Sequence, residues 1–232
     1  MLDVLRAGQL LNDSPNDLRL FGMAPITWYL LGIRIVGRTA VEATRDPQAR
    51  FFARAVTATL REHGHEIHEL IDPFVGSGNV LYHFAKETTA ARGLGIELNP
   101  DIVRRTRRNF EVLHRWKRLS DVDIEIHEGD WSRSSSMIGQ GPTLIIIDPP
   151  WGDAYSKELG LDLRSTQPPI PEILEKMTES SGSAGPLFAA VKTIPGSRSV
   201  DVVVGAYRAF EALRPHDAEL ARWTDYLLLQ LR

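Results

Sequence analysis

The chain of 232 residues contains no cysteine, which excludes disulfide bonds, thiolate nucleophiles and cysteine-ligated metal. Its seven histidines form no metal-binding pattern of the His-Glu-x-x-His type, so we expect no metal site. No apolar run approaches the roughly 18 residues of a membrane span. No signal peptide is visible after Met1. These absences favour a cytoplasmic protein without a membrane partner, and they leave its oligomeric state open.

Positive charge is also scarce, because 27 lysines and arginines stand against 30 acidic residues and give a formal net charge of −3. A general nucleic-acid binder is usually basic. The local exception is the cluster Arg104-Arg105-Thr106-Arg107-Arg108, which is either a solvated helix face or a patch for a phosphate-bearing substrate. We therefore expect a small-molecule or nucleotide-like substrate, with RNA as a less favoured partner.

The most informative stretch present is an apolar run, residues 143–147, that ends at Asp148-Pro149-Pro150-Trp151. Its three isoleucines are typical of a fully buried parallel strand, and the prolines that follow cannot continue a ladder. The Asp148 carboxylate and the Pro149 carbonyl offer two acceptors to an amino group, and Trp151 could stack on the planar group that carries it. Open α/β sheets bind ligands at the carboxyl ends of their strands. The stretch therefore predicts an amine-binding site.

Three other predicted strands also lead to acidic residues. The strand at residues 67–71 precedes the turn Asp72-Pro73-Phe74-Val75-Gly76-Ser77-Gly78-Asn79 and then a helix. Such a turn lets the backbone approach a ligand closely, and the helix start favours anionic groups. The strand that begins at Gly93 ends at Glu97, at about the spacing from Asp72 at which a βαβ fold offers a carboxylate to ribose. The strand at 122–126 leads to Asp130. All four acids are expected along one edge of the sheet.

The remaining segments are less specific. Residues 1–65 predict a mainly helical N-terminal extension, either a lid over the site or a layer on the sheet edge, with Asp46-Pro47 as helix cap and first helical residue. Residues 66–232 predict the catalytic domain. Within it we expect a helix after Pro171, a fifth strand at 187–192 and a final strand at 226–231. Residues 199–213 fit a helix, or a strand followed by a helix.

Together these motifs resemble class I S-adenosylmethionine (SAM)-dependent methyltransferases, in particular the branch that methylates exocyclic amines. The resemblance implies a Rossmann-like α/β sheet flanked by helices, and SAM as the cofactor. The cofactor-binding residues that it implies are Asp72, Phe74, Gly76, Ser77, Gly78, Asn79, Glu97, Leu98, Asp130, Trp131 and Asp148. The catalytic residues that it implies are Asp148, Pro149, Trp151 and Tyr155.

The longer string Asp-Pro-Pro-Trp-Gly-Asp-Ala-Tyr, followed by Asp162-Leu163-Arg164, is similar to trimethylguanosine-synthase-like enzymes. Those enzymes usually have a second glycine where this chain has Asp153, so the substrate does not follow from the likeness. Tyr155 and Arg164 are either contacts at the rim of the site or packing and surface residues.

The expected activity is SAM-dependent N-methylation of an amine held by the Asp148–Trp151 motif. The amine could belong to RNA, to a nucleotide-like molecule or to another small molecule. An alternative is a SAM-consuming cyclase, in which the cofactor's own α-amine attacks its γ-carbon and releases methylthioadenosine, forming azetidine-2-carboxylate. A SAM-binding regulator without chemistry is the non-enzymatic alternative.

Overall fold

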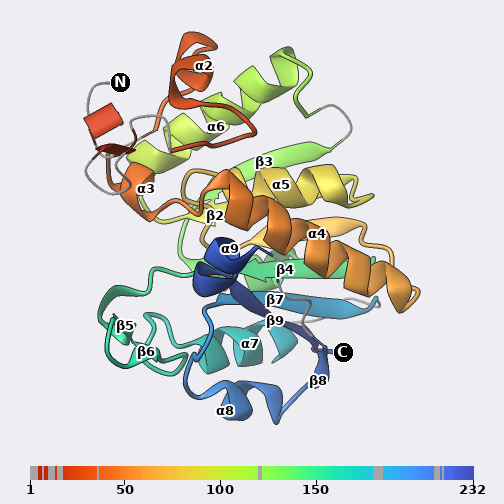
Figure 1. Ribbon diagram of the computed structural model, residues 1–232. Coiled ribbons are helices and arrows are strands. Elements are labelled where there is room, and N and C mark those ends of the chain that lie inside the picture. The colour runs from red at the N-terminus through yellow and green to blue at the C-terminus, as the bar shows by residue number, and fades with distance from the viewer. Residues whose placement is uncertain are drawn as a thin grey trace.

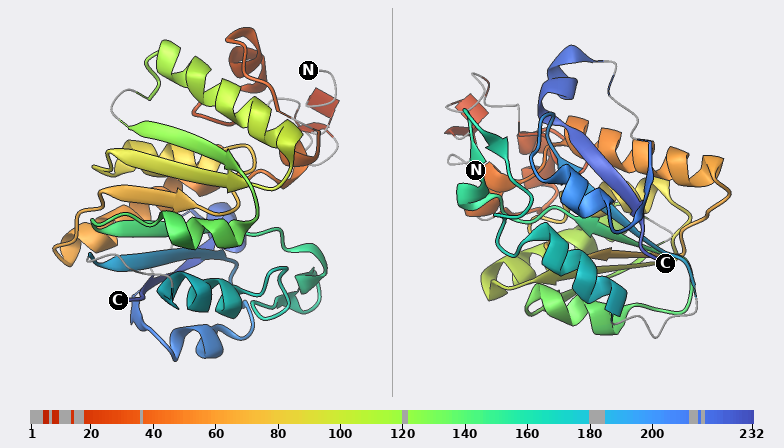
Figure 2. Two further views of the ribbon diagram at one scale, coloured as in Figure 1. Left: turned by 180° about the vertical axis from the view of Figure 1, so that it is seen from behind. Right: turned by 90° about the horizontal axis from the view of Figure 1, so that it is seen from below.

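The computed structural model describes residues 5–6, 8–9, 14, 18–35, 37–119, 122–179, 185–211, 215 and 217–232. Its centre is a seven-stranded sheet in the order β3-β2-β1-β4-β7-β9-β8, with helices on both faces (Figures 1 and 2). The α/β fold with a helix-flanked sheet predicted from the sequence is confirmed. Among the residues just given, no helix combines the length and the apolar character that crossing a membrane requires.

The sheet is mostly parallel. Its parallel strands are β1 (Glu69–Asp72), β2 (Arg92–Glu97), β3 (Asp123–Glu128), β4 (Thr143–Ile147) and β7 (Leu187–Thr193). Strand β9 (Asp225–Gln230) runs antiparallel to β7, and β8 (Arg208–Phe210) runs antiparallel to β9. A small hairpin joins β5 (Tyr155–Ser156) and β6 (Gly160–Leu161). The chain proceeds outward from β1 to β3 on one side and from β4 to β7 on the other, so the strand order reverses between β1 and β4. Ligands bind at such a switch point.

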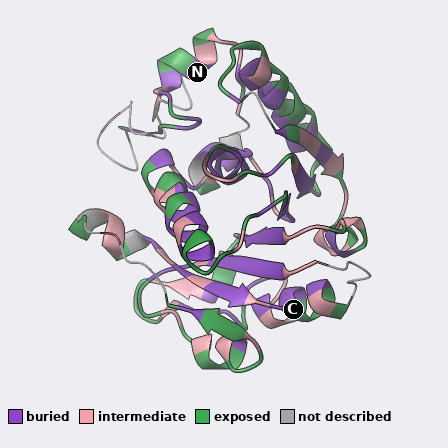
Figure 3. Cartoon of the chain, turned by 90° about the vertical axis from the view of Figure 1, so that its right-hand side faces the viewer, coloured by how far each residue is buried: buried purple, intermediate pink, exposed green. Residues whose placement is uncertain are grey.

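The helices lie in two layers around this sheet. They are α2 (Pro25–Leu30), α3 (Gly37–Glu42), α4 (Asp46–Glu62), α5 (Asn79–Glu87), α6 (Pro100–Arg115), η1 (Trp131–Met137), η2 (Gly152–Ala154), α7 (Ile170–Glu179), α8 (Val200–Val204) and α9 (Ala218–Trp223). Helix α6 begins at Pro100, because the Asn99 side chain before it accepts hydrogen bonds from two backbone N–H groups of the first turn and proline suits the first helical position. Figure 3 shows the buried sheet between helices whose outer faces are exposed.

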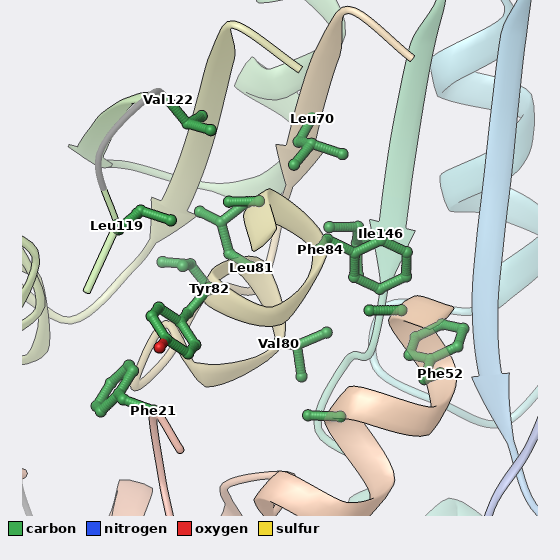
Figure 4. Close-up of a cluster of buried hydrophobic side chains, with 14 of the residues drawn as sticks. Phe21, Phe52, Leu70, Val80, Leu81, Tyr82, Phe84, Leu119, Val122 and Ile146 are labelled. Atoms are coloured by element: carbon green, nitrogen blue, oxygen red, sulfur yellow. The ribbon is translucent and has the colours of Figure 1, made fainter. Parts of the chain in front are cut away.

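Strand β4 is fully buried, as its isoleucine run predicts, and its side chains alternate between two hydrophobic clusters. Ile146 packs on the side of α4 and α5, near Phe52 and Phe84 (Figure 4). Ile145 and Ile147 pack on the other side, with α7. Burying one such side chain stabilises the fold by roughly 1.5–3 kcal/mol. Because β4 is packed on both faces, the position of its carboxyl end, and therefore of Asp148, is fixed relative to the rest of the sheet.

The N-terminal segment, by which we mean residues 18–62, packs against the same cluster as the sheet. Phe52 of α4 meets Phe84 of α5 edge-on at 5.1 Å between ring centroids, and Phe21 meets Tyr82 at 5.5 Å (Figure 4). Aromatic pairs of this geometry contribute about 0.5–1.5 kcal/mol beyond their area. The segment therefore packs closely on the α5 side of the sheet, while the division of the chain into units at residue 65 stays a prediction.

Two local predictions were wrong. Asp46 does not cap α4, because the helix begins at Asp46 itself; its carboxylate accepts a hydrogen bond from Gly22 N–H and contacts His83 instead. A tertiary contact has thus displaced the local capping role. Residues 199–213 were expected to hold a helix, or a strand before a helix. The order found is the short helix α8, ended near Gly205, and then strand β8, which pairs with β9; residues 212–214 lie outside the described part.

Candidate cofactor and amine site

A cavity of about 1140 Å³ opens at the carboxyl ends of β1, β2, β4 and β7. The loops that follow these strands line it, together with the start of η1 and residues 39, 42, 43 and 44 of the N-terminal segment. Its position at the reversal of strand order is where open α/β sheets hold ligands. Its volume exceeds the roughly 300–1,000 Å³ that is usual for small-molecule sites, so it has room for two molecules side by side.

The turn after β1 is held in a tight conformation. Gly76 and Gly78 have φ angles of 46° and 82°, which disfavour any residue with a Cβ. A Cβ on Gly78 would lie 2.6 Å from the ring of Phe110. The Thr106 hydroxyl donates a 2.6 Å hydrogen bond to the Gly76 carbonyl. Helix α6 therefore clamps the glycine turn from behind and leaves its front facing the cavity.

Asn79, the first residue of α5, is buried and has both ends of its amide engaged. Its Oδ1 accepts a hydrogen bond of 2.7 Å from Phe21 N–H, and its Nδ2 donates one of 2.8 Å to the Thr44 carbonyl. Ser77 is also buried, and its Oγ lies 3.4 Å from Asn79 N. Asn79 thus connects the glycine turn to the N-terminal segment.

The acids at the ends of β2 and β3 lie on the same cavity wall. Glu97 accepts a hydrogen bond from Asn99 N–H at 2.8 Å, and Asp130 caps η1 through Ser132 N–H at 3.0 Å. Leu98 is 71% exposed, which is unusual for a leucine next to a strand. Trp131 and Phe74 are stacked, with centroids 6.4 Å apart and planes 27° from parallel. These side chains add apolar surface to a lining that also contains the two carboxylates.

The structure brings most of the sequence-predicted site residues to one cavity. Those that line it are Asp72, Phe74, Gly76, Ser77, Asn79, Glu97, Leu98, Asp130, Trp131, Asp148, Pro149, Trp151 and Tyr155. Gly78 is absent from the lining, since its open side faces Phe110.

Tyr155 and Arg164 differ in their places. Tyr155 lines the cavity with its ring 5.8 Å from Trp151, and it also packs on the cluster around α7. Arg164 is exposed and does not line the cavity. Its backbone N–H donates to Asp162, whose pKa is held below its usual range first by a hydrogen bond from the Ser199 hydroxyl and then by that N–H. The Asp-x-Arg string therefore shapes the loop beside the site.

Negative charge dominates the cavity. Five of its described lining residues carry carboxyl groups: Glu42, Asp72, Glu97, Asp130 and Asp148. Burial raises the pKa of Asp72 from 3.8 to about 8; the Phe74 N–H opposes this, and the nearby Asp148 and Glu97 carboxylates add to it. Among the described residues of the lining, Lys192 is the single basic side chain. A cationic ligand is therefore favoured over most of this surface.

Asp148 is the centre of a small polar cluster. The Thr44 hydroxyl donates to Asp148 Oδ2 at 2.7 Å, and Lys192 Nζ lies 3.1 Å from Oδ2 and 3.3 Å from Oδ1. Lys192 also donates to the Thr44 hydroxyl. Its Nζ lies 5.0 Å from the centre of the Trp151 ring, within cation–π range. An ammonium group of the chain itself thus contacts both the carboxylate and the aromatic face that the sequence assigns to an amine.

Thr44 and Lys192 were missed by the sequence reasoning. Lys192 carried a usable signal, because it is the last residue of the predicted strand 187–192, whose other residues are apolar, and so lies at the same edge as the predicted acids. Thr44 carried none, since it is 104 positions from Asp148 and lies in a segment without a motif.

Comparison with known proteins shows the fold alone. No protein-family model matches the sequence, and no curated protein matches it significantly. Solved structures do match. A presumed methylase from Haemophilus influenzae has a TM-score of 0.51 and 15% sequence identity, and the match covers 79% of this chain and 98% of that protein. A methyltransferase from Geobacter sulfurreducens has a TM-score of 0.50, 14% identity and coverages of 83% and 82%, and a presumed O-methyltransferase from Klebsiella pneumoniae has a TM-score of 0.51, 16% identity and coverages of 88% and 86%. The chain has the class I methyltransferase fold. In that fold the cavity lies at the switch point between β1 and β4, with the glycine turn on one side and Asp148 on the other.

Proposed function

We propose that this chain is a SAM-dependent N-methyltransferase whose acceptor amine is held at Asp148. The observation that carries the proposal is a single cavity lined both by the glycine turn with Glu97 and by the Asp148–Trp151 motif. The first set suits a nucleoside cofactor and the second suits an amine. Their shared wall is what a transfer between the two molecules requires.

Features of the first half of the cavity support SAM as the cofactor. The glycine turn leaves its backbone open to a ligand, and the carboxylate of Glu97 lies at the end of β2, where ribose hydroxyls would be bound. The apolar surface that Leu98, Trp131 and Phe74 offer suits an adenine ring. The buried carboxyl of Asp72 is neutral at pH 7 without a cation nearby, and SAM has two cationic groups. The acidic groups and the apolar surface of this half of the cavity therefore both suit SAM.

In the second half, Asp148 and the Pro149 carbonyl would orient the amine so that its lone pair faces the cofactor side. When bound, SAM supplies an activated methyl group on its sulfonium. Asp148 would oppose the positive charge that grows at nitrogen in the transition state, and binding of both molecules in one cavity would align the amine with the methyl group. A separate strong base is not required, because a methylated aromatic amine loses its proton to water. Within the amine-methylating branch, the trimethylguanosine-synthase-like string at Trp151–Tyr155 supports a nucleotide-like or other planar acceptor.

RNA is the less favoured acceptor because the arginine cluster on α6 is partly occupied within the chain. Arg104 pairs with Asp101 and Arg108 with Glu111, each one turn away. Arg107 donates to the Ile126 carbonyl at 2.7 Å. These contacts within the chain compete with the phosphate contacts that supply the affinity for RNA.

A second candidate is the SAM cyclase, and Lys192 is the observation that favours it. The α-amino acid end of SAM has an ammonium and a carboxylate, and the cavity places an acid and a base in contact with one another. In this reaction the cofactor's amine forms a bond to its own γ-carbon, and the bond from that carbon to sulfur breaks. Methylthioadenosine leaves with the electron pair, and the ring nitrogen loses a proton to water.

The deciding experiment is product analysis. Purified protein is incubated with SAM, with and without a library of aromatic, aliphatic and nucleotide amines, and the nucleoside products are quantified by mass spectrometry. S-adenosylhomocysteine that depends on an added amine supports the transferase, and methylthioadenosine without any added amine supports the cyclase. Asp148→Ala, with the fold checked by circular dichroism, is the matched control. The proposed methyl transfer is wrong if S-adenosylhomocysteine does not exceed that control, and the cyclase is wrong if methylthioadenosine does not.

A further inference from the structure

We infer that Asp148 and Lys192 form a binding site for an α-amino acid group, with the ligand's ammonium at Asp148 and its carboxylate at Lys192. The inference rests on the proposed function, because it names the chemical class of the molecule whose amine reacts in the same cavity. The bound ammonium must first lose one proton to water, which exposes the lone pair that attacks carbon. The amine half at Asp148 follows from the Asp-Pro-Pro-Trp motif, whereas the carboxylate half at Lys192 does not, because the motif contains no cation.

The pair keeps bonding capacity for such a ligand. An ammonium group has three N–H donors, and Lys192 Nζ lies in hydrogen-bond range of both Asp148 oxygens and of the Thr44 hydroxyl. A carboxylate has about four lone-pair positions, and in the described structure the bonds to Asp148 come from Thr44 and Lys192. Two of the three contacts of Nζ go to the same carboxylate, so a ligand carboxylate can replace the longer one, at 3.3 Å, while the 3.1 Å contact keeps the ion pair. Part of the Asp148 carboxylate remains for the ligand's ammonium.

The opposite signs of the ligand also suit the surrounding charge. Every other ionisable residue of the described lining is acidic, so a ligand carboxylate has Lys192 as its one charged partner there. A ligand that has only an amino group would gain nothing from a cation beside Asp148. A lysine with a purely structural role would lose hydration at this position without a ligand to compensate for it. The Trp151 ring, whose centre lies 5.0 Å from Nζ, stabilises the ammonium group of Lys192 through a cation–π contact.

The strand order places the pair on the acceptor side of the cavity. Lys192 is on β7, Asp148 follows β4 and the glycine turn follows β1. Neighbouring strands lie about 4.8 Å apart, so Lys192 is roughly two strand spacings from the glycine turn. The α-amino acid group can belong to a separate acceptor molecule, or to the methionyl end of SAM reaching across β4.

Wild-type protein gives the first test. With S-adenosylhomocysteine saturating, titration calorimetry is run with free amino acids, their carboxamides and the corresponding decarboxylated amines. A separate amino acid acceptor predicts binding of at least one acid that is tenfold or more tighter than binding of its amide and its amine, the usual effect of a charge-assisted bond. The SAM source predicts no such binder, and instead a tenfold preference for SAM over its decarboxylated form.

The second test uses Lys192→Gln, with Lys86→Gln as the matched control because Lys86 is exposed on α5 and outside the cavity lining. Lys192→Gln should abolish the acid-over-amide preference, or the SAM-over-decarboxylated-SAM preference, while Lys86→Gln keeps it. Lys192→Arg should restore part of it, which also answers the objection of misfolding. No carboxylate preference from either source, or a preference that survives Lys192→Gln, overturns the inference. Methyl transfer to plain amines would in that case leave the proposed function intact.

Discussion

The hydroxyl of Thr44 donates a 2.7 Å hydrogen bond to the carboxylate of Asp148 across 104 positions of the chain. Thr44 is buried just before α4, whereas Asp148 follows the central strand β4. The N-terminal segment therefore supplies one of the groups that orient the carboxylate at the centre of the site. A role in positioning, with no contact to the reacting atoms required, is the simplest consequence of this geometry.

Thr44→Val should lower turnover about tenfold, because the isosteric side chain lacks the donor that holds Asp148 and leaves Lys192 one acceptor short. The effect should fall mainly on kcat, with SAM affinity little changed. Thr44→Ser should recover most of the activity. Steady-state kinetics with whichever acceptor is found, plus calorimetry for SAM, measure both quantities. Equal kcat in Thr44→Val and the parent would contradict the positioning role.

Asp148→Ala should lower turnover a hundredfold or more, since a preorganised electrostatic contact acts mostly in the transition state. SAM binding should weaken much less. Asp148→Asn should be milder, because its amide oxygen keeps one acceptor. Both variants are assayed by nucleoside product formation. If Asp148→Ala turns over like the parent, the amine assignment is wrong.

Glu97→Ala should weaken SAM binding by about 1.5–3 kcal/mol, the usual effect of losing charged hydrogen bonds. The same substitution removes the acceptor for Asn99 N–H. Glu97→Gln, which retains an oxygen, is therefore the control for that local change. Calorimetry on both variants separates the two effects. Unchanged affinity in Glu97→Ala with an intact fold would remove the ribose assignment.

Because the pKa of Asp72 is raised to about 8, we expect SAM to bind more tightly as the pH rises toward 8. In the free protein the carboxyl is protonated below its pKa of about 8, and a cationic ligand favours the deprotonated form, so binding releases a proton in that range. The gain can be at most tenfold per pH unit. Asp72→Asn should lose this dependence, and the difference between parent and variant removes the titration of SAM itself. Identical pH profiles would contradict the prediction.

The raised pKa of Asp72 also predicts the direction in which the free energy of unfolding changes with pH. The pKa of Asp72 in the folded state, about 8, is above its ordinary value of 3.8. The folded state therefore holds a proton that the unfolded state has lost between these values. The free energy of unfolding should fall as the pH rises through this window. Thermal unfolding of the parent and of Asp72→Asn at pH 5 and pH 8.5 checks it, with the variant showing the smaller change.

Gly78→Ala should destabilise the protein more than Gly64→Ala. Both glycines have φ near +80°, so each substitution meets the same backbone strain of about 1 kcal/mol. The Cβ at Gly64 has open space, whereas the one at Gly78 lies 2.6 Å from Phe110. The added clash should bring the loss at Gly78 to about 2–4 kcal/mol. Urea unfolding of the two variants measures the difference, and equal losses would mean that α6 yields at no cost.

The core of the fold and the order of its acids were predictable because both follow local rules. A buried parallel strand has an apolar run, and Asp72, Glu97, Asp130 and Asp148 each follow such a run or an alternating one. Strands that run in one direction then bring their ends to one edge. The acids were therefore placed together without knowledge of any long-range contact.

Thr44, Lys192 and the role of Asp46 needed the tertiary structure. Asp46 stands next to a proline at a helix start, which indicates a cap, yet His83 and Gly22 engage its carboxylate. Thr44 meets Asp148 only because α4 packs on α5. Such contacts depend on where a segment docks, and neither periodicity nor spacing encodes that.

Asn79 carries a consequence for the way the site opens. Its amide is committed at both ends to Phe21 and Thr44, and it directly follows the glycine turn. Lifting the N-terminal segment to admit a bulky molecule would break both bonds, a loss of about 1–3 kcal/mol before any packing is counted. It would also free the residue next to the cofactor turn and withdraw the Thr44 hydroxyl from Asp148. Passage of a large acceptor through that side would therefore loosen the cofactor, whereas a small acceptor can use the existing mouth and leave the cofactor held through repeated encounters.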